Sequence, residues 1–100
     1  MSYKIVLLKE AEYDLDDAFL WYEMQKPLLG TKFIEYIDKG FQFITFHPKA
    51  SPEKIEFVRC HIIKKFPFGI YYKLNEEKKE IQIIAVLHFK RNQKMLDQRI

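Results

Sequence analysis

Residues 58–91, VRCHIIKKFPFGIYYKLNEEKKEIQIIAVLHFKR, decide the fold of this chain. They contain three runs rich in apolar and β-branched residues, which predict strands over about 56–63, 68–74 and 80–87. A Lys-Lys-Phe-Pro turn separates the first two runs, and the polar segment 75–79 separates the last two. The segment therefore predicts a small sheet built from consecutive strands.

The last of these strands is apolar on both faces. Strict alternation places its apolar residues in two sets: Ile81, Ile83, Ala85 and Leu87 on one face, Ile84 and Val86 on the other. A strand of this kind belongs inside a sheet that is covered on both sides.

The residues before this segment predict one strand and two helices. A short β-rich run covers Tyr3–Leu8, and apolar residues at helical spacing predict a helix from about Ala11 that ends before Pro27. A second helix is predicted over about Leu28–Phe46. The predicted fold is α+β with β-α-α-β-β-β order. It is a small, mainly antiparallel sheet with a two-helix hairpin packed on one face.

The other face of the sheet has few residues left to cover it. The tail from residue 91 onward offers three apolar residues, Met95, Leu96 and Ile100. We therefore expect this face to be unfinished in the monomer, with an apolar strip exposed beside basic side chains. Such a strip fits a partner segment that is amphipathic and acidic.

Composition predicts one folded domain over residues 1–100. Hydrophobic residues make up 48% of the chain and aromatic residues 16%, which excludes a disordered class. Cys60 has no second cysteine to pair with, and no Cys/His spacing indicates a metal site, so we expect no cofactor and no metal. No apolar run approaches the roughly 20 residues that span a bilayer. We expect a cytoplasmic protein without a membrane partner.

Charge is distributed unevenly along the chain. Residues 1–57 hold 7 lysines, no arginine and 10 acidic residues, a net charge of −3. Residues 58–100 hold 7 lysines and 3 arginines against 4 acidic residues, a net charge of +6. This asymmetry favours an anionic partner on one face, either nucleic acid or an acidic protein segment.

In this order and spacing, the chain resembles the RelE/ParE superfamily of toxins from type II toxin–antitoxin modules. It is most similar to the ParE-like branch, also described as plasmid stabilisation proteins. The resemblance covers nearly the whole chain. It rests on Ala11 with Asp14-Leu15, Trp21-Tyr22, His47-Pro48, Val58-Arg59, Phe66-Pro67-Phe68, Ile70-Tyr71-Tyr72, Ile84-Ala85-Val86, His88, Arg91 and Arg99.

The resemblance implies a growth-inhibiting bacterial toxin that a small, acidic cognate antitoxin neutralises in a toxin–antitoxin hetero-oligomer. RelE-like members cut mRNA on the ribosome, whereas ParE-like members are associated with inhibition of DNA gyrase. We expect a protein that inhibits gyrase by binding it. The alternatives are a metal-independent, ribosome-dependent mRNA endonuclease and a decayed toxin that only binds antitoxin.

An endonuclease of this kind needs a base, an acid and cations that converge on one phosphate. Here His88 with Arg59 and Arg91 would supply them. RelE-like enzymes carry an arginine at the start of the strand that matches residues 68–74, and Gly69 stands at that position. This departure favours the binding hypothesis over the nuclease.

Six residues are predicted to contact the target or the antitoxin: Arg59, Tyr72, Lys90, Arg91, Lys94 and Arg99. Arg59 suits a phosphate or carboxylate, although a structural ion pair to the helix hairpin is an equal alternative. Tyr71 and Tyr72 should point to opposite faces, one into the core. Trp21 is expected in the core, and Cys60 as an inert buried thiol.

Overall fold

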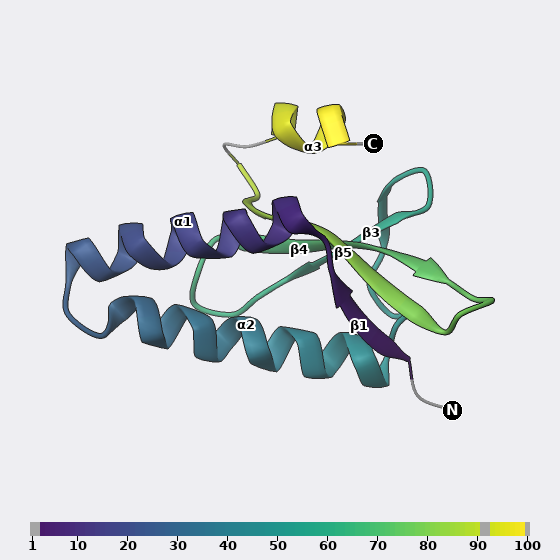
Figure 1. Cartoon of the computed structure of the whole chain (residues 1–100), viewed down its shortest axis with the longest axis horizontal. Helices are drawn as coiled ribbons and strands as arrows, with labels where there is room; N and C mark the ends of the chain where they lie inside the picture. Colours follow the sequence, from purple (N-terminus) through teal and green to yellow (C-terminus); the bar gives the residue numbers. More distant parts are fainter. Residues whose placement is uncertain (1–2, 91–92, 100) are drawn as a thin grey trace.

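The computed structural model describes residues 3–90 and 93–99, and over these the element order is β1-α1-α2-β2-β3-β4-β5-α3 (Figure 1). The elements are β1 Lys4–Leu7, α1 Lys9–Gln25, α2 Leu29–Phe46, β2 Glu53–Ile55, β3 Val58–Ile62, β4 Phe68–Asn75, β5 Glu80–His88 and α3 Gln93–Arg99. The predicted helices and strands are confirmed within about two residues at each end. Two elements were not predicted, the short β2 and the C-terminal α3.

The five strands form one sheet in the order β1-β5-β4-β3-β2. The pairings of β4 with β5, β3 with β4 and β2 with β3 are antiparallel, while β1 pairs with β5 in parallel. The sheet is therefore mixed, although mainly antiparallel as predicted. β5 has a neighbour on each side, which agrees with its two apolar faces.

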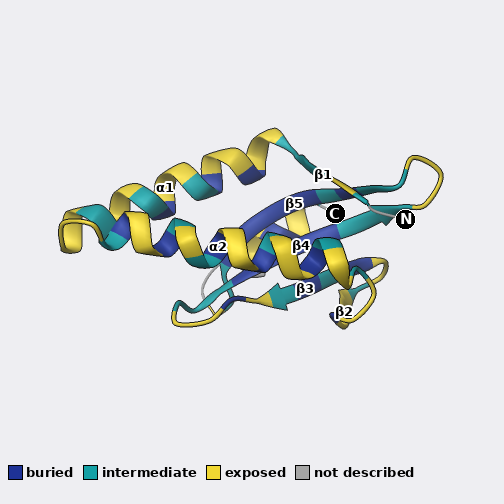
Figure 2. Ribbon diagram, turned by 90° about the horizontal axis from the view of Figure 1, so that it is seen from below, coloured by how far each residue is buried: buried dark blue, intermediate teal, exposed yellow. Residues whose placement is uncertain are grey.

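Helices cover both faces of this sheet. The α1–α2 hairpin packs on one face, and its buried residues point to the sheet while its outer side is exposed (Figure 2). On the other face, α3 contributes Leu96, which is 1% exposed and packs with residues of β3, β4 and β5. The expectation of an unfinished second face is therefore wrong in part, because the tail forms a helix that covers it.

A bulge in β5 changes which residues face which helix. Tyr71 pairs with Ala85 but Tyr72 pairs with Ile83, so Ile84 is an extra residue without a partner position on β4. As a result Ile84 and Ala85 both belong to the α3 side, and Val86 points to the hairpin. The strict alternation predicted for this strand is wrong beyond Ile83, since one inserted residue reverses its phase.

Next to this bulge lies a buried carboxylate, Asp14 of α1. Asp14 Oδ2 accepts a hydrogen bond of 3.0 Å from the backbone N–H of Val86. Both carboxylate oxygens also accept hydrogen bonds from the guanidinium of Arg99, and Arg99 Nη1 reaches the carbonyl of Ile84 at 3.4 Å. This hydrogen bonding and the charge of Asp14 raise the pKa of Arg99. We call this arrangement the Asp14 clamp; it joins α1, β5 and α3.

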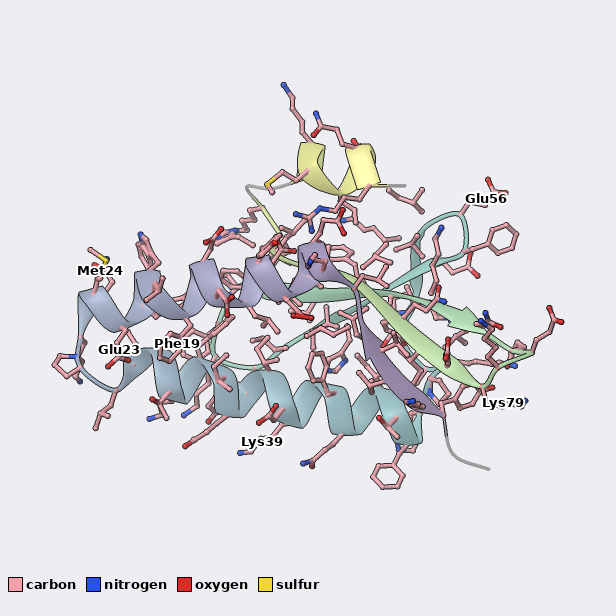
Figure 3. The ribbon with its side chains drawn as sticks, in the orientation of Figure 1. Phe19, Glu23, Met24, Lys39, Glu56 and Lys79 are labelled. Atoms are coloured by element: carbon pink, nitrogen blue, oxygen red, sulfur yellow. The ribbon has the colours of Figure 1, made fainter. Side chains whose placement is uncertain are left out.

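A second carboxylate fixes the turn between the two long helices. Leu28 adopts a left-handed conformation with φ of 72° before α2 begins. Glu23 of α1 accepts hydrogen bonds of 2.9 Å from the N–H groups of Leu28 and Gly30, so it satisfies the first turn of α2 (Figure 3). A Cβ on Gly30 would lie 2.6 Å from the carbonyl oxygen of Phe19, so the close crossing of the helices requires glycine there.

His61 of β3 packs against α2. Its ring stacks on Phe43 with centroids 4.8 Å apart and planes inclined by 19°. Burial lowers the pKa of His61 from its ordinary value of 6.5, because the charged imidazolium loses its hydration. The folded state therefore favours neutral His61.

We predict that Asp14→Ala lowers the free energy of unfolding by about 2–4 kcal/mol, measured by urea denaturation. The change leaves the Val86 N–H without its acceptor and the Arg99 guanidinium without its counter-charge. Asp16→Ala, at an exposed position on the same helix, is the control and should change stability by less than about 0.5 kcal/mol. If Arg99→Leu fails to soften the effect of Asp14→Ala in a double-mutant cycle, the clamp does not act as a unit.

His61 predicts a loss of stability on acidification. Because its pKa is lower in the folded state, the unfolded chain binds more protons as the pH falls through about 6.5, and unfolding becomes easier. The free energy of unfolding, measured by urea denaturation at pH 7.5 and pH 5.5, should therefore fall more steeply for the native chain than for His61→Gln, by at most about 1.4 kcal/mol per pH unit. His47→Gln, at an exposed histidine, is the matched control. Equal slopes for the native chain and His61→Gln would contradict the assignment.

Candidate functional site

A groove of about 280 Å³ runs between α1 and the sheet, at the end where β5 leads to α3. Its lining comes from four elements: Asp14, Asp17, Ala18, Trp21 and Tyr22 of α1, Phe68 of β4, Val86, Leu87 and His88 of β5, and Met95 of α3. The lining is largely apolar and aromatic. A groove of this composition suits the apolar side chains of a protein segment.

Two lysines are close in sequence to residues that line this groove. Lys90 follows His88 by two residues and Lys94 precedes Met95, and both lysines are exposed. The Nδ1 atom of His88 accepts a 3.2 Å hydrogen bond from the backbone N–H of Lys90, and the His88 ring packs between Phe68 and Phe89. The predicted role of Lys90 and Lys94 as binding residues stays a prediction that their exposure favours. Arg91 lies outside the described residues.

Arg59 is held inside the fold. Its Nη1 atom donates to the carbonyl oxygens of Lys49 and Ser51, at 3.1 and 2.7 Å, and Nη2 lies 3.9 Å from Glu53. These contacts fasten the linker between α2 and β2 onto β3. Of the two alternatives for Arg59, the geometry favours a structural role, although its main partners are linker carbonyls and not a carboxylate of the hairpin.

Two other predicted binding residues are also occupied within the chain. Tyr72 is 0% exposed on the hairpin side, and its hydroxyl donates to the carbonyl of Pro48 at 2.8 Å, so its predicted contact with a partner is wrong. Burial raises the pKa of Tyr72 and of Tyr71, which lies buried on the opposite face. The prediction that Tyr71 and Tyr72 point to opposite faces is confirmed. The guanidinium of Arg99 is bound by Asp14 in the Asp14 clamp, so its contact with a partner stays a prediction that this geometry does not favour.

Two of the residues proposed for phosphate chemistry, Arg59 and His88, do not converge. Arg59 pairs with Tyr72 and His88 pairs with Phe68, four residues further along β4, so the two positions are about 13 Å apart in the strand direction and lie on opposite sides of β4. At the position of the nuclease arginine, a Cβ on Gly69 would lie 2.8 Å from the Sγ atom of Cys60. The packing of β3 against β4 thus leaves no room for a side chain at residue 69.

Sequence reasoning placed one residue of α1 incorrectly and missed the role of another. Trp21 was expected in the core but is 52% exposed, with its ring edge-on to Tyr22 at the border of the groove. Asp14 was noted only as part of the family pattern. Its position between Ala11 and Ala18, on the buried side of α1, was the available signal, because an acid among apolar residues at helical spacing requires a buried partner.

Across residues 3–90 and 93–99, no three His, Cys, Asp or Glu side chains come together as potential metal ligands. No helix in the described part of the chain has the length and apolar character needed to cross a membrane.

Comparison with known proteins places this geometry in a family. A family model described as the ParE toxin of the type II toxin–antitoxin system, parDE, matches residues 5–93. The fold is similar to a chain of the chromosomal ParDE toxin–antitoxin system from P. aeruginosa, with a TM-score of 0.75, 20% identity and coverage of 86% of this chain and 95% of that chain. A search of curated proteins found no significant match.

A second solved structure is the toxin–antitoxin complex RelBE2 from Mycobacterium tuberculosis. One of its chains aligns with a TM-score of 0.59 and 16% identity, covering 88% of this chain and 99% of that chain. At these identities the two structures support the fold, while the family model covers most of the sequence. The chain therefore belongs to the ParE toxin family of type II toxin–antitoxin systems.

Proposed function

We propose that this toxin stops bacterial growth by binding DNA gyrase and performs no chemistry of its own. The observation that carries the proposal is the separation of Arg59 from His88, two of the three residues that RNA cleavage was expected to use. Arg59 donates to the carbonyls of Lys49 and Ser51, and it lies about 13 Å along the sheet from His88. Cleavage at one phosphate requires such groups within hydrogen-bond reach of the same atoms.

Gly69 supports the same proposal. In the RelE-like pattern an arginine at this point reaches the substrate, but here the strand packs with Cys60 and Tyr71 where that side chain would begin. Membership of the ParE family favours gyrase, with which ParE-like members are associated. The proposed activity is therefore inhibition through contact surfaces.

We further propose that an acidic antitoxin neutralises the toxin by occupying the groove between α1 and β5. Both similar structures come from toxin–antitoxin systems. Apolar antitoxin residues would fill the space lined by Trp21, Phe68 and Met95, and antitoxin carboxylates would reach Lys90 and Lys94 at its border.

Inhibition of gyrase is tested by inducing expression of the protein in a bacterial host and by adding the purified protein to a gyrase supercoiling reaction. We expect growth arrest with a DNA-damage response and intact mRNA, and loss of supercoiling activity at micromolar toxin. The Arg59→Lys variant keeps the positive charge but loses the guanidinium that bonds the linker carbonyls. It should therefore lower the free energy of unfolding while toxicity is retained. Discrete cuts in mRNA, lost on His88→Ala, would instead establish the nuclease.

The antitoxin site is tested by reversing the charge of the two lysines. Lys90→Glu with Lys94→Glu should weaken binding of the co-encoded antitoxin by about tenfold or more and make its Kd less dependent on salt, measured by titration calorimetry at two ionic strengths. Lys26→Glu with Lys32→Glu, at exposed positions around the α1–α2 turn, is the matched control. An equal loss in both double variants would show a general charge effect and no specific site.

A further inference from the structure

Helix α1 has a second apolar side that faces solvent. Tyr13, Leu20 and Met24 are 58%, 57% and 83% exposed, and at 3.6 residues per turn they lie within about 40° of one another around the helix axis. Leu28, in the turn that follows α1, is 72% exposed. Figure 3 shows Met24 pointing away from the protein at the end of α1. We call these four residues the α1 stripe.

The α1 stripe is distinct from the groove. Ala11 and Ala18 mark the buried side of α1, and Trp21, which lines the groove, is turned by about 80° from Tyr13 around the axis. The residues of the α1 stripe belong to neither core cluster of the described part of the chain, so packing within the chain does not explain them. Large exposed apolar residues that share one side of a helix favour an interaction surface.

Acidic residues border the α1 stripe on both sides. Asp16 and Glu12 lie on one flank, Asp17 and Glu10 on the other, and all four are exposed. Among the exposed residues of the first four turns, Lys9 alone is basic. Such a border repels nucleic acid and anionic lipid, and two copies of the chain would bring the same acids together. The chemistry that fits is a protein surface with an apolar centre and lysine or arginine at its edge.

We propose that the α1 stripe is the surface by which the toxin binds its target protein, through an apolar site on that protein bordered by basic residues. The inference rests on the proposed function, in which the target is a protein and the antitoxin is acidic. Glu10 lies between the α1 stripe and the groove, and Asp17 lies at the border that both surfaces share, so these acids disfavour an acidic antitoxin segment that continues from Lys90 and Lys94 onto the α1 stripe. The toxin therefore meets its two partners through surfaces of opposite charge.

The test replaces the apolar centre of the α1 stripe with acids by combining Leu20→Glu and Met24→Glu. Both side chains are exposed and glutamate is a good helix former, so the fold should persist, as thermal melting will show. At equal protein level, growth arrest should be lost, and inhibition of purified gyrase should weaken by about tenfold or more. Affinity for the co-encoded antitoxin should stay within about twofold. Phe46→Glu, at a residue 78% exposed on α2, is the control and should remain toxic.

The other results distinguish failure of this inference from failure of the proposed target. A double variant that arrests growth as the native chain does shows that the α1 stripe is not needed. Loss of antitoxin binding together with toxicity assigns the α1 stripe to the antitoxin. If the native chain arrests growth without inhibiting gyrase, the proposed target is wrong. The effect of the double variant on growth arrest then tests by itself whether the α1 stripe is needed. A native chain that does not arrest growth refutes the proposed function and this inference with it.

Discussion

The buried carboxylate of Asp14 holds together three elements that are far apart in the sequence. β1 pairs with β5 as far as Leu7 and Ile83, and the chain then turns into α1. From that point Asp14 takes the place of a neighbouring strand, because it accepts the N–H of Val86 beside the bulge. Arg99 supplies the counter-charge that a buried carboxylate requires and brings α3 to the sheet. Asp14 therefore links the hairpin on one face of the sheet to α3 on the other.

The clamp also fixes the rotation of α1 about its own axis. Trp21 is seven residues after Asp14, nearly two full turns, so it lies on the same side of the helix and reaches the groove. Tyr13 and Met24 then face outward. Helix α1 thus separates two surfaces: the groove, which is close in sequence to exposed lysines, and the α1 stripe, which acidic residues border. A toxin that must be held by an antitoxin and also reach a target has a physical reason to keep these surfaces apart.

The sequence predicted both long helices and four of the five strands because each carries a clear periodic or apolar signal, and it predicted the family because the motifs occur in order. The three-residue β2 and the seven-residue α3 are too short to carry such a signal. It did not predict the bulge at Ile84, since an inserted residue reverses the alternation without changing composition. Tyr72 and Arg99 were placed at a binding surface because residue type does not reveal whether a partner lies within the chain. Trp21 was placed in the core for a similar reason: the hydrophobic pattern does not show which apolar side of α1 the sheet covers.

The position of Arg99 in the last turn of α3 matters for anyone who prepares this protein. Proteolysis that removes residue 99 would strip Asp14 of its counter-charge and free Leu96 to leave the sheet. The truncated protein would differ little in mass, yet it would expose the apolar residues beneath α3 and tend to aggregate. Intact-mass spectrometry is therefore the appropriate quality check, and a purification tag is better fused ahead of β1 than behind α3.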